Sequence, residues 1–357
     1  MIADRIARPF RLLVACLALS LAGACSTPDF RDSPNAAHAL PPPESSPATL
    51  AKDVLIADDG TRLPLRIWRP HGEVHAVVIA LHGFNDYSEA YAAPADVWAH
   101  YGIITYAYDQ RGFGANKDPG IWPGARTLCH DLATAVRVVR ARHPDLPVYV
   151  VGESMGAAVI LDSLGGADAS APKPDGVILV SPAVWARETM PLINRIALWV
   201  GARIIPDITF TGKGMGVLAS DNFPMLRRLS RDPLFIKNTR VDAIYGLVDL
   251  MDQALAAGPK LKEPALVLIG AHDEIVPPEP LHDLVNTLPG LRTGDDRIAY
   301  YPDGWHMLLR DIEGPIVAED VAAWIYDHAA PLPSGADDNA ALFFDGKKPA
   351  PSMSASR

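Results

Sequence analysis

The sequence predicts an α/β protein with a mostly parallel, doubly wound sheet and one helical insertion. Apolar runs typical of strands buried on both faces alternate with helical patterns through most of the chain. One of these runs leads into a glycine-flanked serine and then an apolar helix. Two late strands, at residues 176–180 and 265–269, are separated by about 80 residues, which is far more than a crossover needs. That interval therefore predicts a structured insertion.

Length and composition agree with an enzyme of one main domain. The chain has 357 residues, of which 49% are hydrophobic and 21% charged, so it can bury a large core. The net charge is -10, and the part expected to fold contains no basic cluster. We therefore do not expect a nucleic-acid partner. The sequence does not predict an oligomeric state.

Eight strands are expected in the body of the chain. A hairpin signal, Asp59-Gly60, separates the first two. The strands are at residues 54–56, 63–68, 76–81 and 103–108, in a short apolar run that begins at Val148, and at residues 176–180, 265–269 and 297–301. Helical patterns follow most of them, at residues 91–100, 128–142, 157–161 and 316–328. This alternation favours a mostly parallel, doubly wound sheet.

The first 25 residues are expected to be a targeting segment. Three arginines precede an uncharged run at residues 12–24, which is too short to cross a bilayer but has the layout of a secretory signal. The run ends at Cys25, and this arrangement resembles a bacterial lipoprotein signal, in which the cysteine is lipidated. We therefore expect an exported protein that is held at a membrane surface of the bacterial cell envelope by a lipid anchor.

Two alternatives for this segment stay open. Cys16 matches the local lipidation pattern better, but it leaves almost no apolar region after Arg11. Cleavage after Ala24 would instead give a soluble secreted or periplasmic protein. In either case only Cys129 remains in the body, so an intramolecular disulfide is not expected.

The domain boundaries follow from composition. Residues 26–51 are rich in proline, alanine and serine and are expected to form a disordered tether. The core is expected at residues 52–181 and 259–330, interrupted by a helical lid at residues 182–258. Residues 331–357 are predicted to be a disordered tail, although Leu342, Phe343 and Phe344 could dock on the body.

The glycine-flanked serine is the strongest functional signal. Gly152 and Gly156 stand two residues before and two residues after Ser154, in a G-x-S-x-G pattern between a strand and a helix. A serine in a tight strand-to-helix turn leaves no room for a Cβ at either flanking position. The following helix directs free N–H groups towards the same point. Ser154 is therefore the expected nucleophile.

A base and an orienting acid are expected after the lid. Asp273 follows the strand at residues 265–269, and His306 follows the strand at residues 297–301, so both lie at the edge of the sheet where Ser154 lies. The order Ser, Asp, His is that of nucleophile-elbow hydrolases. The rivals are Glu274 for the acid and, for the base, His272 and His282, neither of which follows a separate strand.

The oxyanion hole is expected from two backbone N–H groups. One belongs to Met155, directly after the nucleophile, and the other to Phe84, in the turn after the strand at residues 76–81. Gly83 allows the backbone to approach the site closely. His82 is expected to hold this turn by hydrogen bonding rather than to act as the base.

These motifs together resemble one branch of a known superfamily, that of the monoacylglycerol lipases and lysophospholipases among the α/β-hydrolases. The resemblance spans residues 54–328 and rests on six features: His82-Gly-Phe84, Asp109-Gln-Arg-Gly-Phe-Gly114, Gly152-Glu-Ser-Met-Gly156, Ser230-Arg-Asp-Pro233, Asp273 and Gly304-Trp-His306. It implies an α/β-hydrolase fold with an eight-stranded sheet, an inserted lid and a Ser-Asp-His triad. It also implies hydrolysis of single-chain lipid esters with no cofactor and no metal. The chain departs from the family pattern at Phe84-Asn-Asp86. The resemblance therefore does not imply that this chain recognises a glycerol head group.

The sequence thus favours a serine ester hydrolase that acts on a small or single-chain lipid ester through an acyl-enzyme. The apolar character of the lid interval supports a lipid substrate. One alternative is a serine aminopeptidase or a lactone or amide hydrolase, for which an acidic pocket would be the signal. Another, of a different class, is an envelope lipoprotein that keeps the fold without catalysis; it predicts a broken triad, and all three positions are intact.

Overall fold

A computed structural model describes residues 48–166, 172–212 and 216–347 of the chain. The expected targeting segment with Cys16 and Cys25, most of the predicted tether, and residues 348–357 lie outside the described residues. Among the described helices, none combines the length and the apolar character needed to cross a membrane.

A sheet of nine strands forms the centre of the molecule, in the order β1-β2-β3-β5-β4-β6-β7-β10-β11. The strands from β5 to β11 in this order are parallel, and β1, β2 and β3 pair antiparallel at one edge. The strand bounds are β1 Thr49–Leu50, β2 Val54–Ile56, β3 Arg62–Trp68, β4 Ala76–Leu81, β5 Ile103–Tyr108, β6 Val148–Glu153, β7 Gly176–Val180, β10 Ala265–Gly270 and β11 Arg297–Tyr301. The predicted mostly parallel α/β fold is therefore confirmed.

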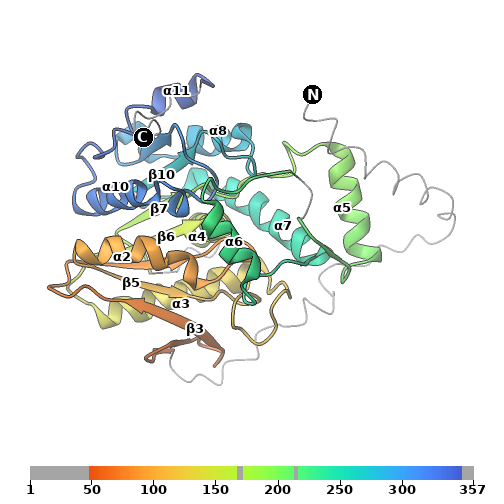
Figure 1. Ribbon diagram of the computed structural model, residues 1–357, viewed down its shortest axis with the longest axis horizontal. Coiled ribbons are helices and arrows are strands. Elements are labelled where there is room, and N and C mark those ends of the chain that lie inside the picture. Colours follow the sequence, from red (N-terminus) through yellow and green to blue (C-terminus); the bar gives the residue numbers. More distant parts are fainter. Residues whose placement is uncertain (1–47, 167–171, 213–215, 348–357) are drawn as a thin grey trace.

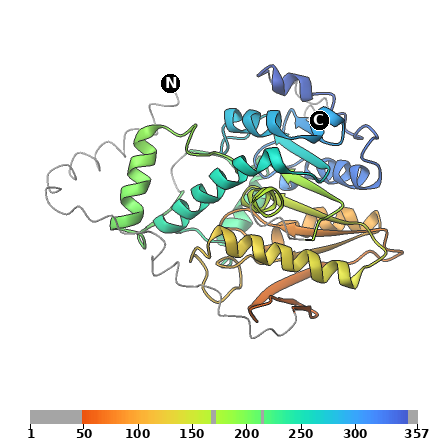
Figure 2. The ribbon, with the colours of Figure 1, turned by 180° about the vertical axis from the view of Figure 1, so that it is seen from behind.

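Helices cover both faces of the sheet (Figure 1). The helices α2 (Ala92–His100) and α10 (Gly314–Tyr326) pack on one face, and α3 (Ala125–Arg142), α4 (Met155–Gly165), α7 (Val241–Ala257) and α8 (Pro278–Thr287) pack on the other, which faces the viewer in Figure 2. Alternate residues of β4 contribute to the two cores, because successive side chains of a strand point to opposite faces. This explains why the strand is apolar at every position.

The sheet has one strand more than expected. Thr49 and Leu50 pair with Ile56 and Leu55 and form β1, inside the segment predicted to be a disordered tether. Two residues carry too short a pattern to be recognised from sequence. Their pairing depends on the exposed edge of β2, which only the fold provides.

The prediction of a disordered tail is wrong for residues 331–347. This segment runs along the outer edge of the sheet, where the Tyr300 N–H donates to the Ala336 carbonyl (2.9 Å) and the Asn339 side chain donates to the Tyr300 carbonyl (3.1 Å). It ends in α11 (Ala340–Phe344), whose Phe343 is buried and stacks on His282. The segment docks on the body because it forms hydrogen bonds with backbone groups at the free edge of β11 and because it buries the Phe343 ring.

The insertion between β7 and β10 contains α5 (Leu192–Ile204), β8 (Thr209–Phe210), α6 (Phe223–Arg231), β9 (Thr239–Arg240) and α7. Helix α7 was expected in the lid, but it packs against α4 and its buried face belongs to the main core. Helix α5 lies outside the layers, beyond α7 (Figure 1). Apolar side chains on and around α5 are exposed: Leu192, Ile193, Ile196, Trp199 and Ile204.

Candidate active site

Ser154 lies in a strained turn at the carboxyl end of β6. Its backbone has φ 54° and ψ −112°, a conformation that is rare for residues other than glycine. The turn is held on both sides: the Ser154 N–H donates to the Val180 carbonyl (2.9 Å), and the Ser154 carbonyl accepts from the Ala157 N–H (3.1 Å). Helix α4 begins at the next residue, so the serine stands at the helix N-terminus.

Close backbone contacts explain the two glycines. A Cβ on Gly152 would lie 2.4 Å from the carbonyl carbon of Gly156, and a Cβ on Gly156 would lie 2.1 Å from the Leu81 carbonyl oxygen. Helix α4 therefore touches the backbone of β4 directly. On the other side of the site, a Cβ built on Gly83 would lie 3.5 Å from the Ser154 Cβ. The turn after β4 is thus packed against Ser154.

The two expected oxyanion donors flank this contact. Met155 is the first residue of α4, and the first N–H groups of a helix have no intrahelical acceptor. Phe84 lies in the turn after β4, which is closed by the Asp86 N–H donating to the Gly83 carbonyl (3.2 Å) and contains Asn85 with φ 68°. Both N–H groups come from segments that meet at Ser154, as a site for an oxyanion requires.

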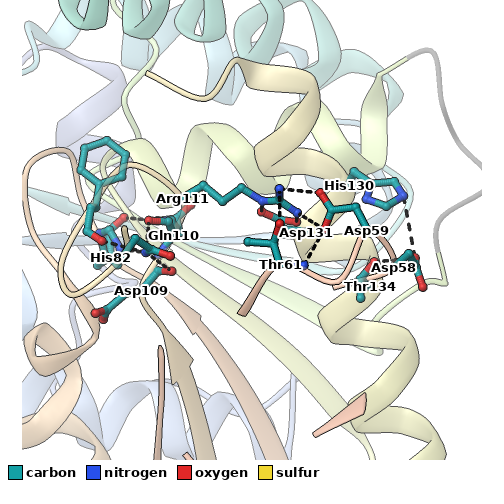
Figure 3. Close-up of polar contacts among 12 residues, drawn as sticks. Asp58, Asp59, Thr61, His82, Asp109, Gln110, Arg111, His130, Asp131 and Thr134 are labelled. Atoms are coloured by element: carbon teal, nitrogen blue, oxygen red, sulfur yellow. Dashed lines mark hydrogen bonds and ion pairs between the residues drawn. The ribbon is translucent and has the colours of Figure 1, made fainter. Parts of the chain in front are cut away.

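His82 is fully buried and holds this turn (Figure 3). Its Nε2 accepts from the Gln110 backbone N–H (2.9 Å), so its Nδ1 carries the proton and donates to the Gly83 carbonyl (2.8 Å). The Gln110 side chain donates in turn to the His82 carbonyl (2.8 Å). Burial lowers the pKa of His82, and the ring is neutral. Since both ring nitrogens are engaged, His82 has no free nitrogen with which to act as a base.

The loop behind His82 is fixed by Arg111 (Figure 3). Its guanidinium donates to both oxygens of Asp59, in the β2–β3 hairpin, and to both oxygens of Asp131, on α3, at distances of 2.6–2.9 Å. Two bidentate carboxylate pairs are a strong restraint on an arginine. Burial raises the pKa of Asp131 to about 6 although Arg111 opposes that shift. The segment Asp109-Gly114 thus has a structural role near the site.

Asp273 and His306 meet at the ends of neighbouring strands β10 and β11. His306 Nδ1 lies 2.8 Å from Asp273 Oδ2, and both side chains are buried. The other Asp273 oxygen accepts from the N–H groups of Ile275 (2.8 Å) and Val276 (3.0 Å), which fixes the carboxylate. Burial lowers the pKa of His306, but the Asp273 charge and hydrogen bond outweigh it, so the pKa is raised. The described residues show no hydrogen bond between His306 and Ser154.

The rival residues occupy other positions. The Glu274 side chain accepts from the Leu218 N–H in the lid (2.9 Å). His272 stacks on Trp305, with ring centroids 5.3 Å apart, and His282 stacks on Phe343. The side-chain contacts of these three residues are thus made away from the Asp273–His306 hydrogen bond.

The one cysteine of the described residues, Cys129, is partly buried. Its thiol lies 3.3 Å from the Asp162 carboxylate, between helices α3 and α4.

Part of the lid is hydrogen-bonded to the loop that carries His306. The Met307 N–H donates to the Ala219 carbonyl (2.9 Å), the Asn222 side chain donates to the Arg310 carbonyl (3.0 Å), and the Ile312 N–H donates to Asp221 (2.9 Å). Asp311 joins the two segments, because its carboxylate accepts from the buried Ser220 hydroxyl (2.6 Å) and from the Trp305 N–H (2.7 Å). Residues 218–222 of the insertion are therefore fixed to the loop that carries His306, and they form part of the structure of the site.

Sequence reasoning missed the charged residues around the triad. Arg310, Asp86 and Glu153 form a buried cluster, and burial raises the pKa of Asp311 to about 7. The sequence indicates these residues only by their position, since each stands within five residues of an expected site residue. Position does not indicate which charged residues pair, because the paired residues follow different strands.

Known proteins resemble this chain in sequence. The family model described as "Serine aminopeptidase, S33" matches residues 72–313. A monoacylglycerol lipase of Mycolicibacterium smegmatis is 26% identical, over 75% of this chain and 94% of its own. A monoglyceride lipase of Rattus norvegicus is 25% identical, over 80% of this chain and 95% of its own.

Solved structures show the same fold. A monoacylglycerol lipase of Paleococcus ferrophilus superposes with a TM-score of 0.60 at 21% identity, covering 74% of this chain and 99% of its own. A soluble variant of monoglyceride lipase from Saccharomyces cerevisiae, in complex with a substrate analogue, gives a TM-score of 0.65 at 18% identity, covering 80% and 99%.

Proposed function

The chain belongs to the serine aminopeptidase S33 family of α/β-hydrolases and is a serine ester hydrolase, and from this premise we propose that it cleaves monoacylglycerol or a similar single-chain lipid ester. Ser154 is the nucleophile, His306 the general base and Asp273 the orienting acid. The observation that carries the proposal is the buried Asp273–His306 hydrogen bond at the sheet edge where the strained Ser154 turn also lies.

The proposed reaction has two steps. His306 Nε2 takes the Ser154 proton while the serine oxygen attacks the ester carbonyl carbon, and the imidazolium then gives that proton to the departing alcohol. A water molecule next attacks the acyl carbon of the acyl-enzyme while His306 Nε2 takes one of its protons. The bond from that carbon to the serine oxygen then breaks, the imidazolium returns the proton to this oxygen, and the fatty acid is released. The Phe84 and Met155 N–H groups stabilise the oxyanion in both steps.

The apolar surroundings support a lipid chain as the acyl group. Phe84 packs edge-on against Phe113 and Trp122, with ring centroids 5.6 and 6.2 Å apart, and Trp122 lies against Gly246 of α7. Helix α5 packs against α7 as well, and it carries exposed apolar side chains. An acyl chain that leaves the serine along α5 and α7 removes apolar area from water.

An aminopeptidase or an amide hydrolase is not favoured by the charges near the site. A cavity of about 460 Å³ beside α2 and α6 includes carboxylates, as an amine-binding pocket would. These carboxylates already have partners, however. Asp86 pairs with Arg310 and Glu89 with Arg66, Asp232 accepts from the Tyr87 hydroxyl, and Asp311 accepts from the Ser220 hydroxyl. A free amine would have to displace them.

The proposal also includes a location. The cationic and apolar segment that ends at Cys25 supports an exported protein anchored to an envelope membrane by lipid. Metabolic labelling with a fatty acid, followed by fractionation, tests this point. Labelling that disappears in Cys25→Ala supports the anchor, and labelling that persists in Cys25→Ala but disappears in Cys16→Ala moves it to Cys16. Absence of labelling in the parent protein argues for a soluble product.

The activity is tested with protein lacking residues 1–25. A fluorophosphonate probe is expected to label Ser154, and p-nitrophenyl esters of increasing length are expected to show the highest turnover at medium or long chains, with monoacylglycerol hydrolysed. Ser154→Ala is the control and should lose both labelling and turnover. Turnover on acetate or aminoacyl substrates alone would overturn the lipid assignment, and full turnover by Ser154→Ala would overturn the site.

A further inference from the structure

One buried cation lies between two carboxylates beside the triad. Arg310 Nη2 is 2.7 Å from Asp86 Oδ2 and 2.7 Å from Glu153 Oε1. The three side chains are at most 8% exposed. The cluster lies outside the hydrogen bonds that join Asp273 to His306, so the reaction described above does not use it directly.

Each member of the cluster comes from a different segment of the site. Asp86 is in the turn that contains the oxyanion donor Phe84 and lies two residues after it. Glu153 is the last residue of β6 and directly precedes Ser154. Arg310 is in the loop after β11, four residues after His306. A single guanidinium therefore connects the oxyanion turn, the nucleophile turn and the base loop.

The cluster is not electrically neutral. Two carboxylates face one guanidinium, and in the described residues Glu153 Oε2 and Arg310 Nε have no hydrogen-bond partner although they are buried. Buried charges of this kind are a poor source of stability compared with apolar packing. Removing only one partner leaves an uncompensated charge in the interior, which is costly. Stability alone therefore does not explain these buried charges, and their role is to be sought in the active site.

We propose, on the basis of the hydrolysis proposed above, that Arg310 is a positioning residue that holds the three catalytic segments in register, and that Glu153 supplies a negative charge that stabilises the imidazolium form of His306. The register matters because the oxyanion donors and the base must act on one tetrahedral centre. The charge matters because His306 is protonated in both tetrahedral intermediates.

The electrostatics agree with this assignment. Burial opposes protonation of His306, whereas the Asp273 charge and hydrogen bond, and then the Glu153 charge, raise its pKa and Arg310 lowers it. Charged or titratable groups face His306 or the cluster from every neighbouring segment: Asp273 after β10, Glu153 at the end of β6, Asp86 after β4, and Arg310 and Asp311 in its own loop. The nearby His82 is neutral, and the Tyr91 hydroxyl donates to the Leu81 carbonyl.

The first test uses Glu153→Gln, which keeps the shape of the side chain and removes its charge. The rate of fluorophosphonate labelling against pH reports the protonation of the base whatever the natural substrate is. We expect the acid limb of this profile to move to lower pH by about 0.5 unit, since a neighbouring negative charge is lost. An unchanged melting temperature would separate this shift from unfolding.

The second test is a double-mutant cycle. Arg310→Met should lower kcat by about tenfold or more with a smaller change in KM, because positioning acts on the transition state. Adding Glu153→Gln to Arg310→Met should recover part of the loss, because it removes the carboxylate that the first change left unpaired. Arg310→Lys should keep the acid limb of the parent, since the positive charge is retained.

Arg297→Met is the matched control. Arg297 pairs with Asp337 (2.8 Å) at the opposite end of β11, so its loss should lower the melting temperature without moving the acid limb. The proposal is overturned if Glu153→Gln leaves the acid limb in place, or if the effects of Arg310→Met and Glu153→Gln simply add. Failure of the parent protein to be labelled at Ser154 would instead overturn the proposed function, which keeps the two outcomes distinct.

Discussion

His306 Nδ1 and Asp273 Oδ2 are 2.8 Å apart, and the second oxygen of that carboxylate is held by two backbone N–H groups. The carboxylate therefore cannot rotate away from the imidazole without losing these bonds. It fixes the proton on Nδ1 and leaves Nε2 as an acceptor, which is the form that a general base requires.

Asp273→Asn should remove most of the activity without unfolding the protein. The asparagine oxygen can keep the Ile275 and Val276 N–H bonds, which turns its amide NH₂ towards His306. The imidazole then carries its proton on Nε2 and cannot accept one from Ser154. We expect kcat to fall by about a thousandfold or more, measured on a p-nitrophenyl ester. Glu274→Gln is the control, and a comparable loss there would contradict the assignment of the acid.

The raised pKa of His306 predicts how activity and stability depend on pH. Since a base must be neutral, kcat/KM should rise with pH through a pKa above the ordinary value of 6.5. Stability follows the opposite sign: a folded pKa above the unfolded one contributes stability at low pH that is lost as pH rises through the folded pKa. A pH–rate profile with an acid limb below 6.5 would contradict this.

Asp311 predicts a second pH effect, on stability alone. Burial raises its pKa from 3.8 to about 7, so the folded state binds a proton that the unfolded state has released. The contribution is present below pH 3.8 and is lost progressively up to about pH 7. Denaturant titrations between pH 5 and 8 should therefore show a smaller decline for Asp311→Asn than for the parent. An equal decline in both proteins would count against this assignment.

Two glycines of the site should respond differently to alanine. In Gly156→Ala the new Cβ would lie 2.1 Å from the Leu81 carbonyl oxygen, so α4 and β4 must separate. We expect a loss of about 3 kcal/mol or more in the free energy of unfolding. In Gly83→Ala the nearest atom is 3.5 Å away, an ordinary contact. Thermal unfolding of both variants checks this, and equal losses would contradict the direct contact of α4 with β4.

The carboxyl-terminal segment should matter for stability up to residue 347. Phe343 is buried against Tyr300 and stacks on His282, so Phe343→Ala should cost about 3 kcal/mol. The matched change is Phe344→Ala, whose side chain is 44% exposed and which should cost far less. Chemical denaturation measures both. Equal and small effects would show that the segment does not bind the body in solution.

The sequence predicted the central features because they have short-range signatures. Continuous apolar runs fix β4 and β6 as buried strands, and the paired glycines around Ser154 identify the turn. Strand ends then place Asp273 and His306 at one edge. The strand β1 and the docking of Phe343 could not be predicted in this way, because each depends on an edge or a pocket that exists only after folding.

The charged cluster shows the same limit inside the site. Arg310 lies 157 positions after Glu153, and Glu153 lies 67 positions after Asp86. No short-range sequence pattern indicates that these residues pair. Asp86 stands where the resembled family differs from this chain, so the resemblance did not help either. The association of α7 with the core rather than the lid has a similar cause, since an apolar helical pattern does not say which surface it will cover.

The hydrogen bonds between residues 218–222 and the loop after β11 have a consequence for engineering. Ala219, Ser220 and Asn222 bond to Met307, Asp311 and Arg310, so that part of the insertion and the base loop fold against each other as one block. A chimera that exchanges the whole insertion with a relative would replace half of these pairs and disturb the base. Grafts should instead be cut within residues 187–212, so that α5 is exchanged and the paired segment stays native.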